Sequence, residues 1–179
     1  MFHKILVAID RSELIQGKFD EILALVKTTG ASLILLNVLS PDDEESPSTP
    51  ILSGFEFYPG GLSTNLIEIY QELWQNYAAK RLELLRSLAD KATAAGIETT
   101  FHQALGNPGL IICDLAREQE VDLIILGRRG RSGLSELILG SVSNYVLHHA
   151  PCSVLTIQRH HQKQSGSTEA KEAKHVATV

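Results

Sequence analysis

Residues 121–157 read VDLIILGRRGRSGLSELILGSVSNYVLHHAPCSVLTI. The stretch opens on a solidly apolar run, Val121 to Leu126, which is typical of a strand buried on both faces of a sheet. A loop that contains glycines follows, then a short helix over Ser141 to His149 and a second strand over Ser153 to Ile157. A strand, a helix and another strand in this order connect parallel neighbours. The stretch therefore predicts a parallel sheet.

The rest of the chain repeats this alternation of strand and helix. The pattern predicts further strands over residues 4–10, 32–39 and 97–105. It predicts helices from Ser12 or Glu13 to Gly30, over about 64–95, and from Asn107-Pro108 onward. The strand over 97–105 alternates in polarity, which places it near an edge. The expected fold is a doubly wound α/β domain, a five-stranded parallel sheet with helices on both faces.

The length and composition fit one domain with about twenty residues left over. The chain has 179 residues, of which 44% are hydrophobic and 21% charged. These values exclude a collagen-like chain, a disulfide scaffold and a chain that is disordered throughout. A polar, proline-rich insert occupies about residues 40–62, and residues 159–179 form a polar tail with few large apolar side chains. We expect one domain over residues 1–158, followed by a disordered tail.

Charge and hydropathy restrict the partners. The net charge of −5 argues against a nucleic-acid-binding protein. The apolar runs are far shorter than the roughly 18 residues that a spanning helix requires, and we find no pattern of a signal peptide. The sequence therefore predicts a cytoplasmic protein with neither a membrane nor a nucleic-acid partner.

The loop after Leu126 has the composition of a phosphate site. Its glycines allow a ligand to approach the main chain, and Gly140-Ser141 opens a helix whose N-terminus favours an anion. Arginines supply positive charge in the same loop. Each feature alone also has a simpler explanation, since a glycine suits any turn, Ser141 suits a plain helix cap, and an arginine cluster suits a solvated surface. Their common position between a strand and a helix favours a phosphate site.

The spacing of this loop is more specific than its composition. Gly127, two residues, Gly130, nine residues, Gly140 and Ser141 resemble the nucleotide-binding signature of the universal stress protein family, in its ATP-binding type. The resemblance extends over about residues 1–158, and Cys152-Ser153 is a mild departure from the usual ending. It implies a Rossmann-like fold of the adenine nucleotide alpha hydrolase type.

The resemblance also implies a ligand and its contacts. The ligand is ATP, or ADP or AMP, with Mg²⁺ held through the phosphates and not by the protein. Asp10 binds the ribose or adenine side, Ala8, Ile9 and Val38 frame the base, and the remaining residues surround the ribose and phosphates. These remaining residues are Gly127, Arg128, Gly130, Arg131, Gly140, Ser141, Val142 and Ser143.

The expected function is that of a regulatory stress-response module that binds an adenine nucleotide, with at most slow ATP hydrolysis. No histidine in the sequence is a convincing general base, so we assign no catalytic residue. Two alternatives stay open, namely an ATP-dependent nucleotidyl or phosphoryl transferase and a nucleotide-free interaction module. The strand over Ser153 to Ile157 would lie at a sheet edge without a blunting charge or proline, which predicts a homodimer through this strand.

Overall fold

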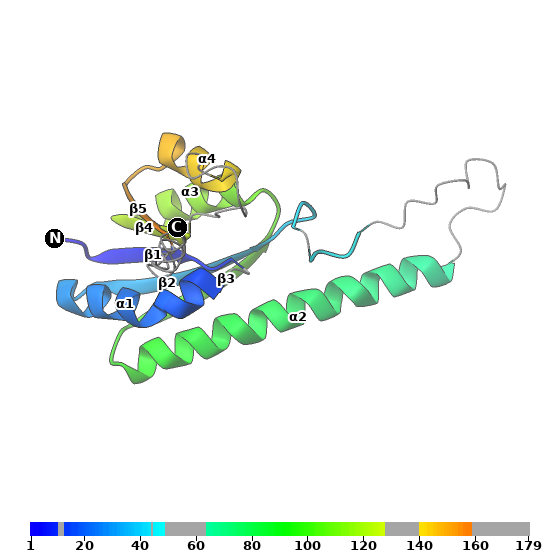
Figure 1. Cartoon of the computed structure of the whole chain (residues 1–179), viewed down its shortest axis with the longest axis horizontal. Helices are drawn as coiled ribbons and strands as arrows, with labels where there is room; N and C mark the ends of the chain where they lie inside the picture. Colours follow the sequence, from blue (N-terminus) through cyan, green and yellow to red (C-terminus); the bar gives the residue numbers. More distant parts are fainter. Residues whose placement is uncertain (11–12, 44, 49–63, 128–139, 159–179) are drawn as a thin grey trace, which may run out of the picture.

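The computed structural model describes residues 1–10, 13–43, 45–48, 64–127 and 140–158. In this part of the chain, five parallel strands form one sheet in the order β3-β2-β1-β4-β5 (Figure 1). The predicted fold class is therefore confirmed, and the strands over 97–105 and 153–157 lie at the two edges as expected. The elements are β1 (Lys4–Ala8), α1 (Glu13–Thr29), β2 (Ser32–Leu39), α2 (Thr64–Ala94), β3 (Thr99–Leu105), α3 (Pro108–Glu118), β4 (Leu123–Gly127), α4 (Ser141–His149) and β5 (Ser153–Ile157).

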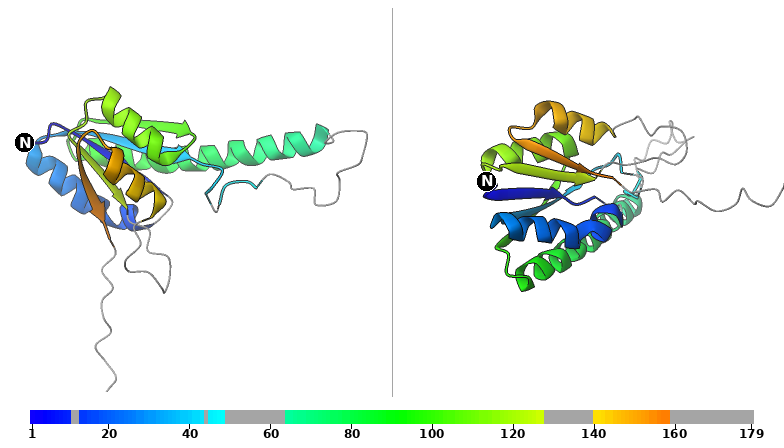
Figure 2. Two further views of the ribbon diagram at one scale, coloured as in Figure 1. Left: turned by 90° about the horizontal axis from the view of Figure 1, so that it is seen from above. Right: turned by 60° about the vertical axis from the view of Figure 1, so that its left-hand side comes forward.

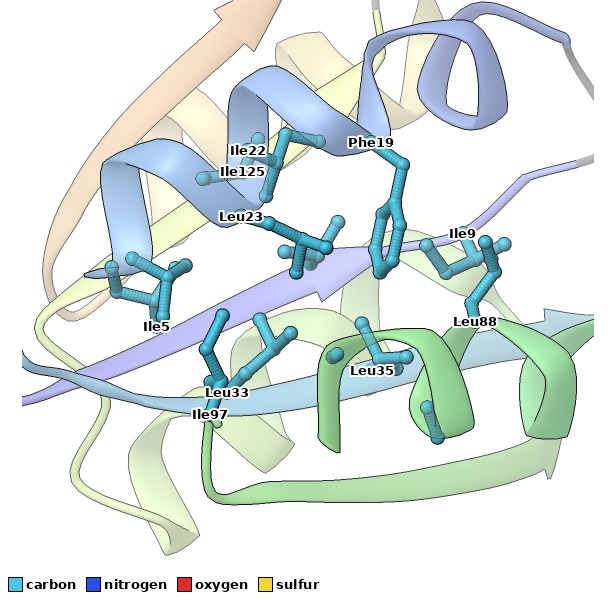
Figure 3. Close-up of a cluster of buried hydrophobic side chains, with 14 of the residues drawn as sticks. Ile5, Ile9, Phe19, Ile22, Leu23, Leu33, Leu35, Leu88, Ile97 and Ile125 are labelled. Atoms are coloured by element: carbon cyan, nitrogen blue, oxygen red, sulfur yellow. The ribbon is translucent and has the colours of Figure 1, made fainter. Parts of the chain in front are cut away.

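The sheet separates two apolar cores. Helices α1 and α2 cover one face and α3 and α4 cover the other (Figure 2). Successive residues of β1 alternate between them, because Ile5 and Val7 belong to the first core and Leu6 to the second. Figure 3 shows the first core, in which Phe19 of α1 lies over the central strands and is fully buried. Strands buried on both faces account for the continuous apolar runs in the sequence.

Two strands begin two residues later than the sequence predicts, at Thr99 and at Leu123. The residues expected to open them instead end the preceding helices. The N–H of Ile97 donates to a carbonyl of α2 at 3.1 Å, and that of Val121 donates to a carbonyl of α3 at 2.9 Å. Both bonds belong to the helix-ending motif in which the residue before them takes a left-handed conformation. Apolar character alone does not distinguish such a residue from the first residue of a strand.

Asp122 fastens the amino end of the sheet. Its carboxylate accepts hydrogen bonds from the main-chain N–H of His3 at 2.7 Å and of Lys4 at 2.9 Å. The Lys4 ammonium in turn donates to the carbonyl of Gln119 at 2.6 Å. These contacts join the starts of β1 and β4, which are neighbours in the sheet. They lie at the opposite end of the strands from the cavity described below.

Helix α2 is much longer than the sheet it covers. Its 31 residues correspond to about 46 Å, and its N-terminal part extends beyond the strands (Figure 1). Three large apolar side chains of this part, Ile67, Ile69 and Leu73, are exposed. No helix in the described residues has both the length and the apolar character needed to cross a bilayer.

Helices α3 and α4 approach closely at Gly109. A Cβ atom added there would lie 2.7 Å from the ring of Tyr145. That ring is also stacked on His149, with 4.0 Å between the ring centroids. Glycine at position 109 therefore allows the two helices on this face of the sheet to come together.

We expect Asp122→Asn to reduce the loss of unfolding free energy that the protein shows as the pH falls below about 4. The N–H groups of His3 and Lys4 hold the pKa of Asp122 below its usual range. A carboxylate with a lowered pKa stabilises the fold fully above its unfolded pKa of about 4, and this contribution is lost as the pH falls through the folded pKa. Denaturant titrations between pH 7 and pH 2 should show a shallower acid loss in the variant. Asp114→Asn, which removes an exposed carboxylate, is the control, and equal acid limbs in wild type and Asp122→Asn would contradict the assignment.

We expect Gly109→Ala to destabilise the protein by about 1–3 kcal/mol, because the new methyl group overlaps the Tyr145 ring. Gly17→Ala is the matched control. Gly17 lies inside α1, and apart from its chain neighbours and the backbone of its own helix nothing lies within 4 Å of the position a Cβ would take there. That change should stabilise the protein by about 0.5–1 kcal/mol, since alanine favours a helix interior. Thermal unfolding of both variants checks the opposite signs, and a neutral Gly109→Ala would show that the contact relaxes freely.

Candidate functional site

A cavity of about 350 Å³ lies at the carboxyl ends of the central strands. The chain runs outward from β1 through β2 to β3, and then returns to β4 on the other side of β1. The strand order thus reverses between β1 and β4, and open α/β sheets bind ligands in the crevice at such a point. The volume falls within the range of small-molecule sites. The position of the cavity follows directly from the topology.

The cavity brings together the predicted site residues that the structure describes. Of the twelve residues, nine line it, and they come from β1, β2, β4 and α4: Ala8, Ile9, Asp10, Val38, Gly127, Gly140, Ser141, Val142 and Ser143. The other three, Arg128, Gly130 and Arg131, lie outside the described residues, as do most of the insert and the whole polar tail. The structure therefore assembles the described part of the predicted site, while its binding role stays a prediction.

The floor of the cavity is apolar. Leu36, Ile112 and Leu126 line it, and all three are buried in the core between the sheet and α3 and α4. Tyr145 and Val38 add partly buried side chains to the lining. A cavity with such a floor suits a flat, largely apolar ring rather than a compact ion.

The end of β1 exposes main-chain groups of β2. In β2, the hydrogen bonds of Ser32 and Leu36 run to β1, and those of Leu33 and Leu39 run to the β3 side. Alternate residues of a strand face opposite neighbours, so the N–H and C=O of Val38 face the β1 side. There β1 has already ended at Ala8. Val38 lines the cavity, and within the described residues its N–H and C=O have no main-chain partner on the β1 side, so it presents one donor and one acceptor next to each other.

The sequence analysis extends the first strand to Asp10, and this boundary is wrong because β1 ends at Ala8. The N–H of Ile9 still donates to Leu36 at 2.7 Å. Its carbonyl, however, accepts from the side-chain amide of Asn37 at 3.0 Å. A side chain thus replaces the next main-chain bond of the ladder, and the two strands separate at this point.

Two helices begin at the cavity, and they differ in how their ends are capped. Helix α3 is capped by Asn107, whose Oδ1 accepts from the N–H of Leu110 at 3.3 Å. Helix α4 begins after Gly140, which has no side chain with which to accept such a bond. The first N–H groups of a helix have no partner within the helix, and they attract anions. The N-terminus of α4 is therefore the better anion site.

Serine 143 fixes this helix end against β4. Its hydroxyl donates to the carbonyl of Gly127 at 3.2 Å, and its side chain is buried. The sequence analysis assigns Ser143 to the ribose and phosphates. In the structure its hydroxyl proton is already used to join α4 to the end of β4, so it serves at least to position the helix.

The start of the acidic insert, which the sequence suggested could fold over the site, forms an acidic rim on the cavity. Asp42 and Asp43 line it, together with the buried Ser40. Asp43 accepts a hydrogen bond from the hydroxyl of Tyr77 at 3.0 Å. Burial is the main cause that raises the pKa of Tyr77, and the nearby Asp43 carboxylate raises it further. The sequence shows the acidic run in the insert, but not that α2 holds its first part at the cavity.

A second contact joins this segment to α2. Arg81 is buried and binds Glu45 at 2.6 Å, and its guanidinium lies 5.4 Å from the centre of the Tyr77 ring. The Glu45 side chain is half exposed, so water screens the pair in part, but the contact ties the segment to α2. In the described residues, no group of three or more histidine, cysteine, aspartate or glutamate side chains is arranged to hold a metal ion.

Comparison with known proteins identifies close relatives. The model of the universal stress protein family matches residues 1–158. The universal stress protein Sll1388 of Synechocystis is 34% identical over 157 residues, which is 88% of this chain and 98% of that protein. A second Synechocystis protein, Slr1101, is 43% identical over 102 residues, which is 57% of this chain and 94% of its own length.

Solved structures agree with the fold. The universal stress protein UspA from Lactobacillus plantarum superposes with a TM-score of 0.66 at 25% identity, over 87% of this chain and 97% of that one. A universal stress protein in complex with cAMP has a TM-score of 0.55 at 22% identity, over 88% and 97% of the two chains. One from Archaeoglobus fulgidus in complex with dAMP has a TM-score of 0.51 at 18% identity, over 87% and 98%. With a family match over most of its length and relatives above 30% identity, the chain belongs to the universal stress protein family.

Proposed function

We propose that this protein binds ATP, or ADP or AMP, in the cavity at the ends of β1 and β4 and acts as a regulatory module. One observation carries the proposal. The N-terminus of α4, whose N-cap residue Gly140 has no side chain to cap it, and the N–H and C=O of Val38 lie at the same cavity. A site of this kind offers anion binding at one place and base recognition at another. The complexes of two structural neighbours with cAMP and dAMP support an adenine nucleotide.

The base would bind at β2. Adenine carries a hydrogen-bond acceptor at N1 and a donor at its exocyclic amine, and these match the N–H and C=O of Val38. Guanine carries the two groups in the opposite order, so a base held in the same orientation would place donor against donor. The apolar floor formed by Leu36 and Ile112 would contact the ring.

The sugar and phosphates would extend from β1 toward α4. A carboxylate at Asp10 accepts from ribose hydroxyls, and the first N–H groups of α4, at Ser141 and Val142, would bind a phosphate. Gly127 lies next to this helix end in the cavity. Mg²⁺ would be held by the phosphate oxygens and water, which suit this ion. The proposal assigns it no protein ligand.

The proposal treats hydrolysis as slow at most. Phosphoryl transfer requires a positioned water or acceptor as well as stabilisation of charge on the phosphoryl group. The N-terminus of α4 supplies charge stabilisation only, and no residue is assigned to position water. The transferase alternative predicts steady turnover of ATP with an acceptor. It would be favoured if one substitution abolished that turnover and left the affinity for ATP unchanged. A cavity that binds no nucleotide would favour the interaction module.

We also propose that two copies pair through β5. This strand lies at the edge of the sheet, and its Leu155 is 41% exposed. Edge strands present unpaired main-chain groups and usually carry charges or proline that prevent pairing. None of the five residues Ser153–Ile157 is charged or a proline. A two-fold axis would place the same strand of each copy side by side.

Isothermal titration calorimetry with ATP tests the binding proposal. Ser141→Asp should weaken ATP binding by roughly tenfold or more, because its carboxylate takes the place of the phosphate and repels it. The same change favours the helix dipole, so the fold should not suffer. Asn144→Asp adds the same charge one turn later on α4, outside the cavity lining, and should change affinity far less. The absence of any heat or thermal shift with ATP, ADP and AMP would overturn the proposed function.

Analytical ultracentrifugation at micromolar concentration tests the dimer. The wild type should sediment as a dimer, and Leu155→Lys should shift it to a monomer, since lysine on an edge strand opposes pairing. Leu110→Lys, at an exposed position of α3, is the control and should leave the dimer intact. A monomeric wild type would contradict pairing through β5.

A further inference from the structure

We propose that Asn37 is a positioning residue that keeps the main chain of Val38 available to the base and so sets the preference for adenine. The inference rests on the proposed function and goes beyond it, because Asn37 is not one of the residues predicted to contact the nucleotide. Its side chain is buried and lines the cavity, and its neighbours in β2 from Leu33 to Leu39 are all apolar.

The Ile9 carbonyl and the base compete for one donor, the N–H of Val38. At the end of β1, the carbonyl of Ile9 faces β2, since the N–H of the same residue donates to Leu36. In an unbroken parallel ladder, the next donor to that carbonyl would be the N–H of Val38. The Asn37 amide takes this place, with 3.0 Å between Nδ2 and the Ile9 oxygen. The carbonyl is thereby satisfied without the main chain of Val38.

The Asn37 amide is oriented by a second hydrogen bond. Its Oδ1 accepts from the side-chain amide nitrogen of Gln103 at 3.3 Å. With the oxygen held by that donor, the nitrogen must face Ile9, and the reversed amide would bring two donors and two acceptors together. Gln103 therefore fixes which end of Asn37 meets β1.

Gln103 is itself held by helix α2. The same nitrogen donates to the carbonyl of Ala78 on α2 at 3.1 Å. A chain of hydrogen bonds thus runs from α2 through β3 and β2 to the end of β1. Among the described residues, every buried side-chain nitrogen or oxygen has a hydrogen-bond partner. The network is complete without nucleotide, which is what a pre-formed base site requires.

Asn37→Leu tests the role directly. Leucine has a similar size and no donor, so the Ile9 carbonyl should recruit the Val38 N–H and remove it from the base. We expect ATP affinity to fall roughly tenfold or more, with a marked loss of the preference for ATP over GTP. Binding of inorganic tripolyphosphate, which probes only the phosphate part of the cavity, should stay unchanged.

Gln103→Leu is the matched control. It removes the neighbouring amide, but the Ile9 carbonyl still favours the nitrogen end of the Asn37 amide. The change should therefore lower thermal stability and yet keep most of the ATP preference. A merely structural role of Asn37 predicts the opposite pattern, in which both variants lose stability and affinity while the ratio of ATP to GTP affinity stays constant. That constant ratio would overturn the inference.

Nuclear magnetic resonance of the wild type provides a second test, which remains available if Asn37→Leu does not fold. The Val38 N–H should exchange rapidly without ligand and become protected with ATP, but not with tripolyphosphate. The side-chain amide protons of Asn37 should be protected in all three states. A Val38 N–H already protected without ligand would refute the inference while leaving ATP binding intact. A wild type that binds no nucleotide would refute the proposed function, and the inference with it.

Discussion

The two central parallel strands differ in length, and the candidate site depends on this difference. Ala8 is the last residue of β1 and pairs with Leu36, whereas β2 continues to Leu39. The longer strand therefore presents main-chain groups for which the shorter one offers no partner. On its other side β1 neighbours β4, where the strand order reverses and open α/β sheets bind ligands. The cavity, the exposed edge of Val38 and the role of Asn37 all follow from the early end of β1.

The site relies on the main chain more than on side chains. Strand edges and helix ends are fixed by the fold, so they lose little conformational freedom when a ligand binds. The polar side chains at the cavity mainly hold these groups in place: Ser143 joins α4 to β4, and Asn37 holds the end of β1. At the acidic rim of the cavity, the contacts of Asp43 with Tyr77 and of Arg81 with Glu45 attach the start of the insert to α2.

The sequence predicts the sheet well because its signals are local. Continuous apolar runs identify central strands, alternation in residues 97–105 identifies an edge, and the strand ends point to the cavity. Contacts across elements leave no such signal. Asn37 looks like a stray polar residue in a core strand until Gln103 and the Ile9 carbonyl are placed beside it. Likewise, nothing local pairs Gly109 with Tyr145, since their contact exists only once α3 and α4 pack.

The carboxylate of Asp122 has a wider consequence for this architecture. It fastens β1 to β4 at the end of the sheet where the strands start, while the candidate site lies at the end where they finish. Substitutions far apart in a fold tend to add independently. Substitutions at the cavity can therefore change the ligand preference of such a protein without lowering its stability. A laboratory redesign can do the same if it leaves the residues around Asp122, at the amino end of the strands, unchanged.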